Sequence, residues 1–382
     1  MAPLDPRARL SMKRRIAFID YFPPHYRRLL YEEIARRMDA DFYFFSDESE
    51  RWHNKQIAAV HDGDYQRVDL RRIRIAGQAV LPGIVRALRK DRYDAVIKNL
   101  NGKLMLPLTY TSARMRGVPF VLWTGMWHHP TTFFHRRTRF LTEGVYRGAD
   151  AIVAYGSHVK RFVSATDGVP AEKVFVAGQA VDPAPFERVD AEVSTNSDIV
   201  FVGQFKEYKG IQPLLDAFEL LNGNGAKLRL IGNGPLEPEI RRHAATVRGA
   251  VEIVGHVPQE RLPDELGRAR CLVLPSATTE LDREPWGLVV NEAMHAGLPV
   301  VASDAVGAAA GGLVRDRQNG RIVPERDPEA LAGALRELMV DPALAERLGA
   351  QARIDARAFN YDRMATAFEQ AVEYAVASRA RS

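Results

Sequence analysis

Two glutamates flank a glycine in residues 275–303, with Glu284 on one side of Gly287 and Glu292 on the other. The pattern around them predicts a strand, a loop with Glu284, a helix that opens at Gly287, and a second strand. A glycine at a helix start lets a ligand approach the backbone. The free N–H groups and the positive dipole end there suit a phosphate. Glu284 is expected to accept hydrogen bonds from sugar hydroxyls, and Glu292 to accept two hydroxyls of a ribose.

A simpler explanation of the two glutamates stays open, with Glu284 as a carboxylate at a helix entry and Glu292 as a surface residue. Two further patterns predict no chemistry. The DGD at 62–64 precedes a strand-like run, as a turn does. The GNG at 232–234 lacks the third glycine of a dinucleotide site. The GAAAGG at 307–312 has the composition of a flexible loop, and a role for it in the site stays open.

Strand-like apolar runs alternate with helical patterns along the chain, which predicts parallel sheets covered on both faces by helices. An amphipathic helix is predicted at 25–38. The strands predicted in the first half are 14–22, 40–45, 93–98, 119–124, 149–155 and 173–178.

The alternation restarts after residues 180–197, whose prolines, acidic residues and polar tail are typical of a linker. The second series of strands is predicted at 198–203, 227–232, 250–255, 270–275 and 298–303. Helices are predicted near 210–222, 235–246, 260–268 and 287–296, and over most of the chain beyond 327. The fold class is therefore α/β, with two doubly wound Rossmann-like domains, residues 1–182 and 183–359. Ligands are expected between them, beyond the carboxyl ends of the strands.

The composition is that of an ordinary globular protein, because 46% of the 382 residues are apolar and 26% are charged. No window of 18 apolar residues predicts a transmembrane helix. The first 15 residues lack the apolar region of a secretory signal, and Met12 is an alternative start after a loose extension. The single cysteine, Cys271, excludes an internal disulfide, is expected to be buried and inert, and suits a reducing cytosol.

Positive charge is concentrated in the first half. Residues 1–182 contain 30 Lys and Arg against 19 Asp and Glu, a net charge of +11, while residues 183–382 contain 23 against 29, a net charge of −6. The arginines expected near the surface of the first domain are Arg27, Arg28, Arg36, Arg37, Arg71, Arg72 and Arg74. They suggest an anionic acceptor or an anionic membrane surface as partner, or else they only solvate helices. Nucleic acid is not expected, since basic blocks with interleaved aromatic residues are missing.

Residues 198–340 resemble the nucleotide domain of the family 4 retaining glycosyltransferases, which have the GT-B fold. Glu284 and Glu292 have the spacing of that family's Glu-x7-Glu motif, with Trp-Gly-Leu at 286–288 in the expected slot. FVGQFKEYKGIQPLLDAFELL is similar to the family's first strand and helix, and LRLIGNGPLEPEI to its Gly-x-Gly-Pro turn. DYFPPHYRRLL and AYGSHVKRFV resemble the N-terminal half more loosely. The resemblance implies that the first domain binds the acceptor and that a helix at 360–382 packs back on it.

Roles for individual residues follow from the resemblance. Glu284 would contact the donor sugar, and Glu292 would hold the ribose. Gly287 and Leu288 would offer backbone N–H groups to the diphosphate, whose charge Lys209 would neutralise. A solvated lysine at a helix start is the simpler explanation for Lys209.

The sequence departs from the family at the first strand of the nucleotide domain. The family usually has an arginine after the glycine there, and this chain has Gln204 after Gly203. Gly203 keeps its place in the donor site by the resemblance. Lys206 is the candidate to replace the missing cation, and weaker donor binding is the alternative.

A second departure concerns the catalytic histidine, which the family often places directly after the fifth strand. Here His128 and His129 come about three residues later. His128 is the favoured candidate, His129 is close behind it, and both are loop histidines in the simpler explanation. The sequence places no metal partner at a useful spacing from them.

The function implied by the resemblance is retaining transfer of a hexose-type sugar from a nucleotide-diphosphate sugar to an acceptor hydroxyl, with no cofactor and no divalent metal. A glycan, a lipid-linked molecule or a small molecule would be the acceptor, in the synthesis of cell-envelope glycan, glycolipid or polysaccharide. The expected location is the cytoplasm or the inner face of the membrane. Two alternatives remain: a non-catalytic nucleotide-sugar-binding protein on the same scaffold, and a nucleotide-sugar 2-epimerase.

Overall fold

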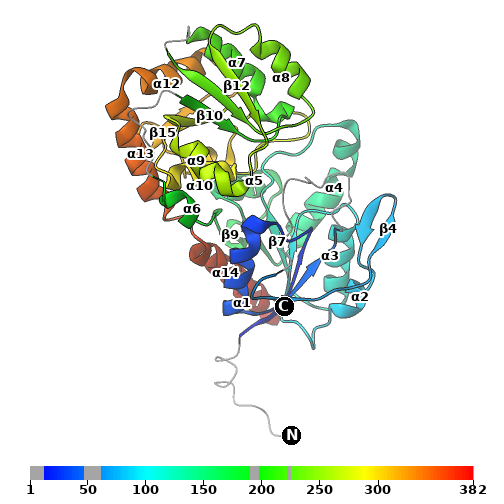
Figure 1. The fold of residues 1–382 in the computed structure, drawn as a ribbon. Coiled ribbons are helices and arrows are strands. Elements are labelled where there is room, and N and C mark those ends of the chain that lie inside the picture. The colour runs from blue at the N-terminus through cyan, green and yellow to red at the C-terminus, as the bar shows by residue number, and fades with distance from the viewer. Residues whose placement is uncertain (1–12, 47–61, 190–197, 222–224, 382) are drawn as a thin grey trace.

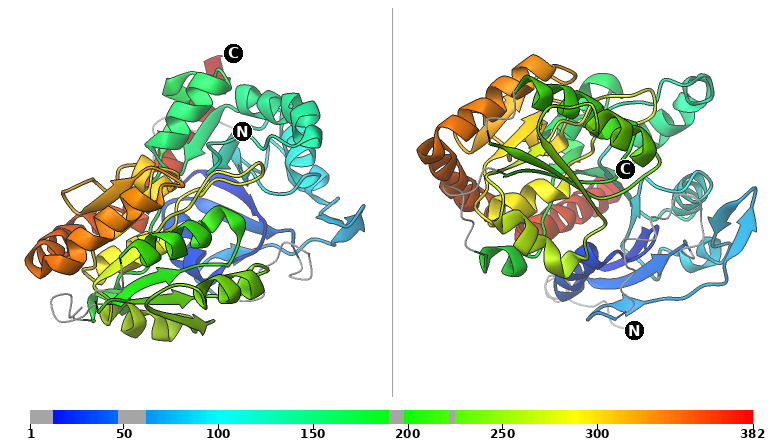
Figure 2. Two further views of the ribbon diagram at one scale, coloured as in Figure 1. Left: turned by 90° about the horizontal axis from the view of Figure 1, so that it is seen from above. Right: turned by 45° about the horizontal axis from the view of Figure 1, so that its top comes forward.

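The computed structural model describes residues 13–46, 62–189, 198–221 and 225–381. They form two α/β units, each built on its own parallel sheet (Figure 1, Figure 2). The extension expected before Met12 and residues 190–197 of the expected linker lie outside these ranges. No helix within the described ranges combines the length and the apolar character that crossing a bilayer requires.

The first unit has a seven-stranded sheet with the order β3-β2-β1-β6-β7-β8-β9, in which every neighbouring pair is parallel. Its strands are β1 (Arg15–Asp20), β2 (Asp39–Phe44), β3 (Gln66–Arg67), β6 (Ala95–Asn99), β7 (Phe120–Thr124), β8 (Ala151–Ala154) and β9 (Val174–Val176). Each strand predicted for the first half is present. The edge strand β3 and a separate hairpin of β4 (Ile73–Ile75) and β5 (Gln78–Val80) have no counterpart among the predicted strands.

Helices cover both faces of this sheet. They are α1 (Arg28–Arg37), α2 (Ile84–Ala87), α3 (Met105–Met115), α4 (Phe133–Gly148) and α5 (Ser157–Thr166). On one face, α2, α3, α5 and the end of α4 share a buried apolar cluster with the strands. On the other face, α1 shares a second cluster with the last helix of the chain.

The second unit has a six-stranded parallel sheet with the order β12-β11-β10-β13-β14-β15. Its strands are β10 (Asp198–Val202), β11 (Lys227–Ile231), β12 (Ala250–Gly255), β13 (Cys271–Leu274), β14 (Val300–Ser303) and β15 (Gly320–Val323). Its helices are α6 (Ala184–Glu187), α7 (Ile211–Leu220), α8 (Glu237–Ala244), α9 (Leu262–Gly267), α10 (Leu288–His295), α11 (Gly307–Ala310), α12 (Pro328–Val340) and α13 (Pro342–Ala356). The two doubly wound α/β units predicted from the alternation are confirmed, and Cys271 is buried as expected.

Part of the expected linker is ordered structure. Asp182 accepts a hydrogen bond from the backbone N–H of Ala184 at 3.0 Å, which starts the short helix α6. Phe186 on that helix is buried in the apolar cluster of the second unit. Residues 182–187 of the predicted linker are therefore ordered, because a side-chain hydrogen bond and one buried ring fix this stretch on the second unit.

The last helix, α14 (Tyr361–Arg381), crosses back and lies against α1 and strands β6 to β9 of the first unit (Figure 1). Phe368 packs on Phe18, with ring centroids 5.7 Å apart. Near its end, the Arg379 guanidinium binds the Asp150 carboxylate at 2.7 Å. The crossing helix predicted at 360–382 is confirmed.

Candidate functional site

The second sheet changes its strand order between β10 and β13, which are neighbours in space and distant in sequence. In doubly wound sheets, ligands bind beyond the carboxyl ends of the strands at such a point. The chain leaves β10 through Gly203 and a short 3-10 turn, Glu207–Lys209, and it leaves β13 into the loop with Glu284. The fold therefore brings the predicted residues of both segments to one place.

Lys209 and Glu284 form a buried ion pair at this point. The Lys209 ammonium contacts Oε2 of Glu284, and Ser276 Oγ donates to the same oxygen at 3.2 Å. Only 9% of Lys209 and 5% of Glu284 are exposed. The simpler explanation for Lys209, a solvated lysine at a helix start, is therefore wrong, because its ammonium is buried and contacts Glu284.

The Lys209 ammonium keeps its charge in the folded protein. Burial alone would lower the pKa of the Lys209 ammonium, but the adjacent Glu284 carboxylate outweighs burial and raises that pKa above its ordinary value. The electrostatic potentials of a carboxylate and an ammonium in contact nearly cancel at long range. An anion that approaches this point would compete with Glu284 for the ammonium.

Gly287 makes the turn from the Glu284 loop into α10. Its φ is 88°, in the left-handed region that favours glycine. A Cβ atom at this position would lie 2.7 Å from Cδ2 of Leu274. The turn starts α10 at Leu288, and the first N–H groups of a helix have no acceptor within the helix. The predicted anion-binding features, a glycine turn and a helix start, are thus next to the ion pair in sequence.

Glu292 lies in the middle of α10 and is buried. Its Oε1 accepts a hydrogen bond from Nε2 of Gln259 at 3.0 Å. Burial raises the pKa of the Glu292 carboxyl to about 7, and the Gln259 amide opposes this shift. The surface alternative for Glu292 is therefore wrong.

Gly203 and Lys206 take different positions around the ion pair. A Cβ atom on Gly203 would lie 3.7 Å from Cδ of Lys209, so the glycine lies along the lysine stem. Lys206 is exposed and precedes the turn that carries Lys209. It makes no ion pair with a described residue.

The GAAAGG segment contains a helix and is not the flexible loop that its composition predicts. The N–H groups of Gly307 and Ala308 donate to the carbonyl oxygens of Glu284 and Trp286, at 3.1 and 2.8 Å. A Cβ atom on Gly307 would lie 2.0 Å from the carbonyl oxygen of Pro285. Glycine at this position therefore lets α11 pack directly on the backbone of the Glu284 loop.

The first unit contacts the same loop. Trp127 Nε1 donates to the carbonyl oxygen of Glu284 at 2.9 Å, and Nε2 of His158 lies 3.1 Å from the carbonyl oxygen of Pro285. The Arg283 guanidinium lies 3.6 Å from the centroid of the Trp127 ring. The sequence did not indicate these contacts, because the partners are distant in sequence and belong to different units.

His158 is neutral near pH 7, because burial lowers its pKa to about 4, although the carbonyl group of Pro285 opposes the shift. A neutral ring with its proton on Nε2 donates to that carbonyl group. The start of α5 and the loop after β13 are thus joined by an uncharged hydrogen bond.

The two histidines after β7 face different surroundings. His128 is half-buried beside the second unit, and burial lowers its pKa, although the backbone of Thr279 opposes the shift. Its Nε2 is buried without a hydrogen-bond partner among the described residues. His129 instead binds the Asp167 carboxylate of its own unit at 2.8 Å. Of the two histidines, His128 is therefore the one beside the Glu284 loop.

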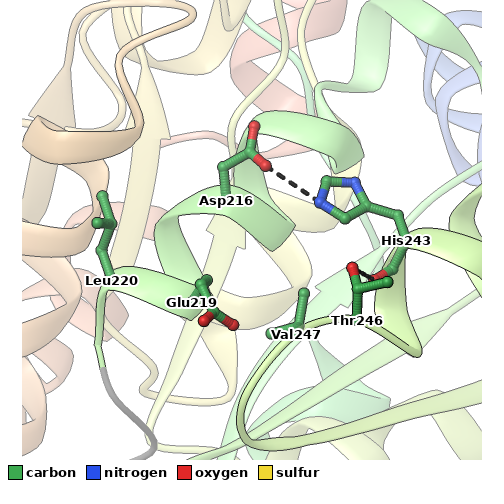
Figure 3. A pocket seen from close by; sticks show the side chains of 6 residues that line it. All are labelled: Asp216, Glu219, Leu220, His243, Thr246 and Val247. Atoms are coloured by element: carbon green, nitrogen blue, oxygen red, sulfur yellow. Dashed lines mark hydrogen bonds and ion pairs between the residues drawn. The ribbon is translucent and has the colours of Figure 1, made fainter.

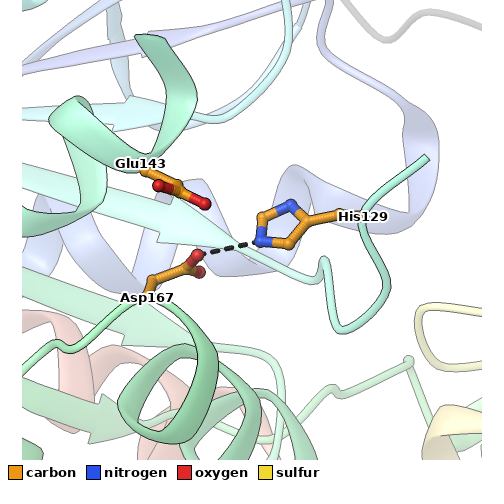
Figure 4. A group of neighbouring side chains, drawn as sticks. All are labelled: His129, Glu143 and Asp167. Carbon is orange, nitrogen blue, oxygen red and sulfur yellow. Dashed lines mark hydrogen bonds and ion pairs between the residues drawn. The ribbon is translucent and has the colours of Figure 1, made fainter. Parts of the chain in front are cut away.

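His129 also belongs to a group with the chemistry of a metal site (Figure 4). One ligand atom each of His129, Glu143 and Asp167 lies within 4.8 Å of the others, and zinc accepts such a set. The fold thus supplies partners that the sequence did not indicate. However, Arg139 and Arg147 already contact the Glu143 carboxylate and offset its charge. We therefore assign His129 and Asp167 to a structural pair.

A pocket of about 250 Å³ lies between the ends of α7 and α8 (Figure 3). Asp216 and His243 line it and form an ion pair of 3.1 Å across its rim. None of the predicted site residues lines this pocket. Its place in the fold, away from the carboxyl ends of the strands, separates it from the candidate site.

Comparison with known families gives a match in the second unit. Residues 185–355 match the family described as "Glycosyl transferases group 1". The chain is 28% identical over 266 residues to an alpha-D-kanosaminyltransferase from Streptomyces kanamyceticus, covering 64% of this chain and 67% of the relative. It is 36% identical over 184 residues to a D-inositol 3-phosphate glycosyltransferase from Streptomyces griseus subsp. griseus, covering 44% and 37%. The chain thus spans well under half of the second relative.

Solved structures share the whole fold. A sucrose-phosphate synthase from Thermosynechococcus elongatus superposes with a TM-score of 0.73 at 20% identity, over 94% of this chain and 98% of that one. HepE from Anabaena in complex with UDP superposes with a TM-score of 0.71 at 18% identity, over 94% and 99%. The fold is that of the GT-B glycosyltransferases, as the sequence resemblance implied.

Proposed function

We propose that this protein is a retaining glycosyltransferase of family 4, which transfers a hexose-type sugar from a nucleotide-diphosphate sugar to an acceptor hydroxyl. The observation that carries the proposal is the buried Lys209–Glu284 pair, next in sequence to a glycine turn and a helix start. A structural neighbour solved with UDP supports a nucleotide as part of the donor.

In the proposed complex the diphosphate lies at the start of α10. The backbone N–H groups of Gly287 and Leu288 donate to its oxygens, as anions are bound at helix N-termini. Lys209 leaves Glu284 in part and neutralises the phosphate charge. Glu284 is then free to accept hydrogen bonds from the donor sugar, and Glu292 accepts the two hydroxyls of the ribose. Lys206 is a secondary contact at the exposed edge, in place of the arginine that the family usually has.

The proposed reaction breaks the bond between the sugar C1 and the diphosphate oxygen and forms one between C1 and the acceptor oxygen on the same face. The diphosphate is already a good leaving group, stabilised by Lys209 and the helix start. A phosphate oxygen takes the acceptor proton, so no protein nucleophile takes part. His128 contacts the sugar from the first unit. No divalent metal and no cofactor are required in this proposal.

The proposed acceptor is a glycan, a lipid-linked molecule or a small molecule that binds the first unit on the cytoplasmic side. The basic balance of that unit supports an anionic acceptor or one at a membrane surface, as in cell-envelope glycan, glycolipid or polysaccharide synthesis.

The test is nucleotide release from a panel of UDP-, GDP-, ADP- and dTDP-sugars, with and without acceptors and with a metal chelator. We expect release from one donor, unaffected by the chelator, and a product with the anomeric configuration of the donor. If the protein binds a donor but releases no nucleotide with any acceptor tried, it would instead be a non-catalytic binding protein. Inversion at C2 of the sugar would indicate a 2-epimerase, and inversion at C1 would exclude the retaining mechanism.

A further inference from the structure

Helix α4 has an unusual outward face. Phe133, Phe140 and Leu141 are exposed to 71%, 66% and 59%. They lie at positions i, i+7 and i+8, and the exposed Arg136 and Arg137 lie between them at i+3 and i+4. This spacing places all five side chains on one side of the helix. Three large apolar side chains together on one exposed helix face are typical of an interaction surface.

The two arginines on this face are free of carboxylate partners. Arg136 and Arg137 form no ion pair with any residue in the described ranges, whereas Arg139 and Arg147 of the same helix bind Glu143. The Arg137 guanidinium lies 5.7 Å from the centroid of the Phe133 ring. The face therefore combines uncompensated positive charge with apolar rings, which favours an anionic lipid surface. A second copy of the same face would bring like charges together.

Four of the seven arginines singled out from the sequence do not form such a surface. Arg27 is buried. Its guanidinium contacts the side chain of Gln179 and also lies over the ring of Trp123. Arg28 binds Glu32, and Arg36 and Arg37 bind Glu33. Their expected place at the surface is thus wrong for Arg27, and the charge of the other three is already paired.

The inner side and the start of α4 are fixed to the protein. Val145 and Tyr146 are buried in the first unit, and the Thr132 side chain caps the helix by accepting from the N–H of His135. Thr131, just before the cap, donates its N–H to the carbonyl oxygen of Glu280 in the loop that leads to Glu284, at 2.7 Å. The exposed face therefore adjoins the junction of the two units.

From these observations we infer that the outward face of α4 docks the protein on an anionic bilayer. Phe133, Phe140 and Leu141 enter the boundary of headgroups and acyl chains, while Arg136 and Arg137 contact lipid phosphates. Docking in this way brings the junction that contains Glu284 close to the lipid surface, where a lipid-linked acceptor would be met. The meeting with a lipid-linked acceptor rests on the proposed function, whereas the docking itself does not.

The test is co-sedimentation of the full chain with phosphatidylcholine vesicles, with and without phosphatidylglycerol, at low and high salt. We expect binding only with phosphatidylglycerol, and weaker binding at high salt. Arg136→Gln with Arg137→Gln should weaken it roughly 10- to 30-fold, since each arginine near an anionic surface contributes about fivefold. Phe140→Ser with Leu141→Ser should weaken it at least tenfold, because exposed side chains lose their apolar contact.

The matched control is Arg242→Gln with Arg347→Gln, which removes the same charge from exposed helix positions of the second unit. It should keep wild-type binding, and all variants should keep their melting temperature and their affinity for nucleotide. Absence of binding at low salt, or equal loss in the control, overturns the inference. A wild-type dimer that Phe140→Ser with Leu141→Ser converts to a monomer overturns it in favour of a second copy. Nucleotide release is measured separately, so failure of one proposal leaves the other intact.

Discussion

Trp127 of the first unit donates its indole N–H to the main-chain carbonyl oxygen of Glu284 in the second, 157 positions away in sequence. The same oxygen accepts the N–H of Gly307 at 3.1 Å. The backbone that carries the predicted catalytic carboxylate is therefore held from both units. Any movement of one unit against the other must break a contact at Glu284.

We predict that Trp127→Phe lowers turnover three- to tenfold and lowers the free energy of unfolding by about 1 kcal/mol, because it removes one hydrogen bond and keeps an aromatic ring beside Arg283. Initial rates and urea unfolding measure the two effects. Trp123→Phe is the control, since its buried Nε1 has no partner among the described residues. If the control loses as much turnover as Trp127→Phe, the hydrogen bond has no special role.

We predict strong coupling between Lys209 and Glu284. Removing one member of a buried ion pair leaves the other unpaired, so Lys209→Met and Glu284→Gln should each cost about 3 kcal/mol of unfolding free energy. The double variant should cost clearly less than the two single costs combined. Equilibrium unfolding in urea of all four proteins gives the coupling energy.

Two controls accompany this double-mutant cycle of Lys209 and Glu284. The exposed pair of Arg241 and Glu237 should show a coupling of about 0.5 kcal/mol or less. The exposed Lys206→Ala should leave the unfolding free energy unchanged and affect donor binding less than Lys209→Ala. A larger loss of donor binding in Lys206→Ala would assign the phosphate contact to Lys206 instead.

We predict different kinetic effects for the two glutamates. Glu284→Gln should mainly lower kcat, about 100-fold, because we assign its contact to the sugar in the transition state. Glu292→Gln should mainly raise the donor KM, about tenfold, because a ribose contact acts equally in the ground state and the transition state. Steady-state kinetics at saturating acceptor separate the two parameters. The assignment fails if both variants change kcat and KM alike.

We predict that the stability of the free protein falls as pH rises through the range in which Glu292 titrates. Its pKa is about 7 in the folded protein against 4.5 ordinarily, because burial disfavours the charged form. Below about pH 4.5 the carboxyl is protonated in both the folded and the unfolded state, so the free energy of unfolding is not reduced. Above it, the unfolded chain ionises first, and stability falls by about 1.4 kcal/mol per pH unit until about pH 7.

Glu292→Gln removes this effect. The melting temperature of the variant minus that of the wild type should therefore increase as the pH rises from about 5 to 8. Glu346→Gln, at an exposed position of α13, should show no such trend. In the wild type, nucleotide affinity should increase over the same range, because the ionised carboxylate accepts ribose hydroxyls better than the protonated one. A difference in melting temperature between Glu292→Gln and the wild type that stays constant from about pH 5 to 8 would contradict the prediction.

The sequence predicts the sheets well, because buried strands depend on local patterns, and it also predicts that the segments after β10 and β13 lie together. Buried parallel strands appear as short apolar runs, and the residues after β10 and β13 must meet wherever those strands are neighbours. The edge strands β3 and β15 are missing from the predicted strands, since β3 has only two residues and β15 begins at a glycine, Gly320.

Contacts between distant segments could not be predicted. His129 pairs with Asp167, Arg27 is buried among aromatic rings, and α11 packs on the Glu284 loop through Gly307. In each case the local sequence favours a solvated or flexible residue. The tertiary partner changes the outcome, and no spacing rule identifies that partner from one sequence.

The crossing of α14 also sets an order for folding during synthesis. The buried residues of the apolar cluster of the second unit lie between Phe186 and Ala356, so they are all present before α14 is made. The cluster that joins Ile16 and Phe18 to the first sheet needs Met364 through Ala375. At roughly 5–20 residues per second, about 10–40 s separate the translation of β9 from that of α14. The unit encoded first is therefore the last to complete its core, and one face of its sheet is covered by α1 alone until α14 emerges from the ribosome.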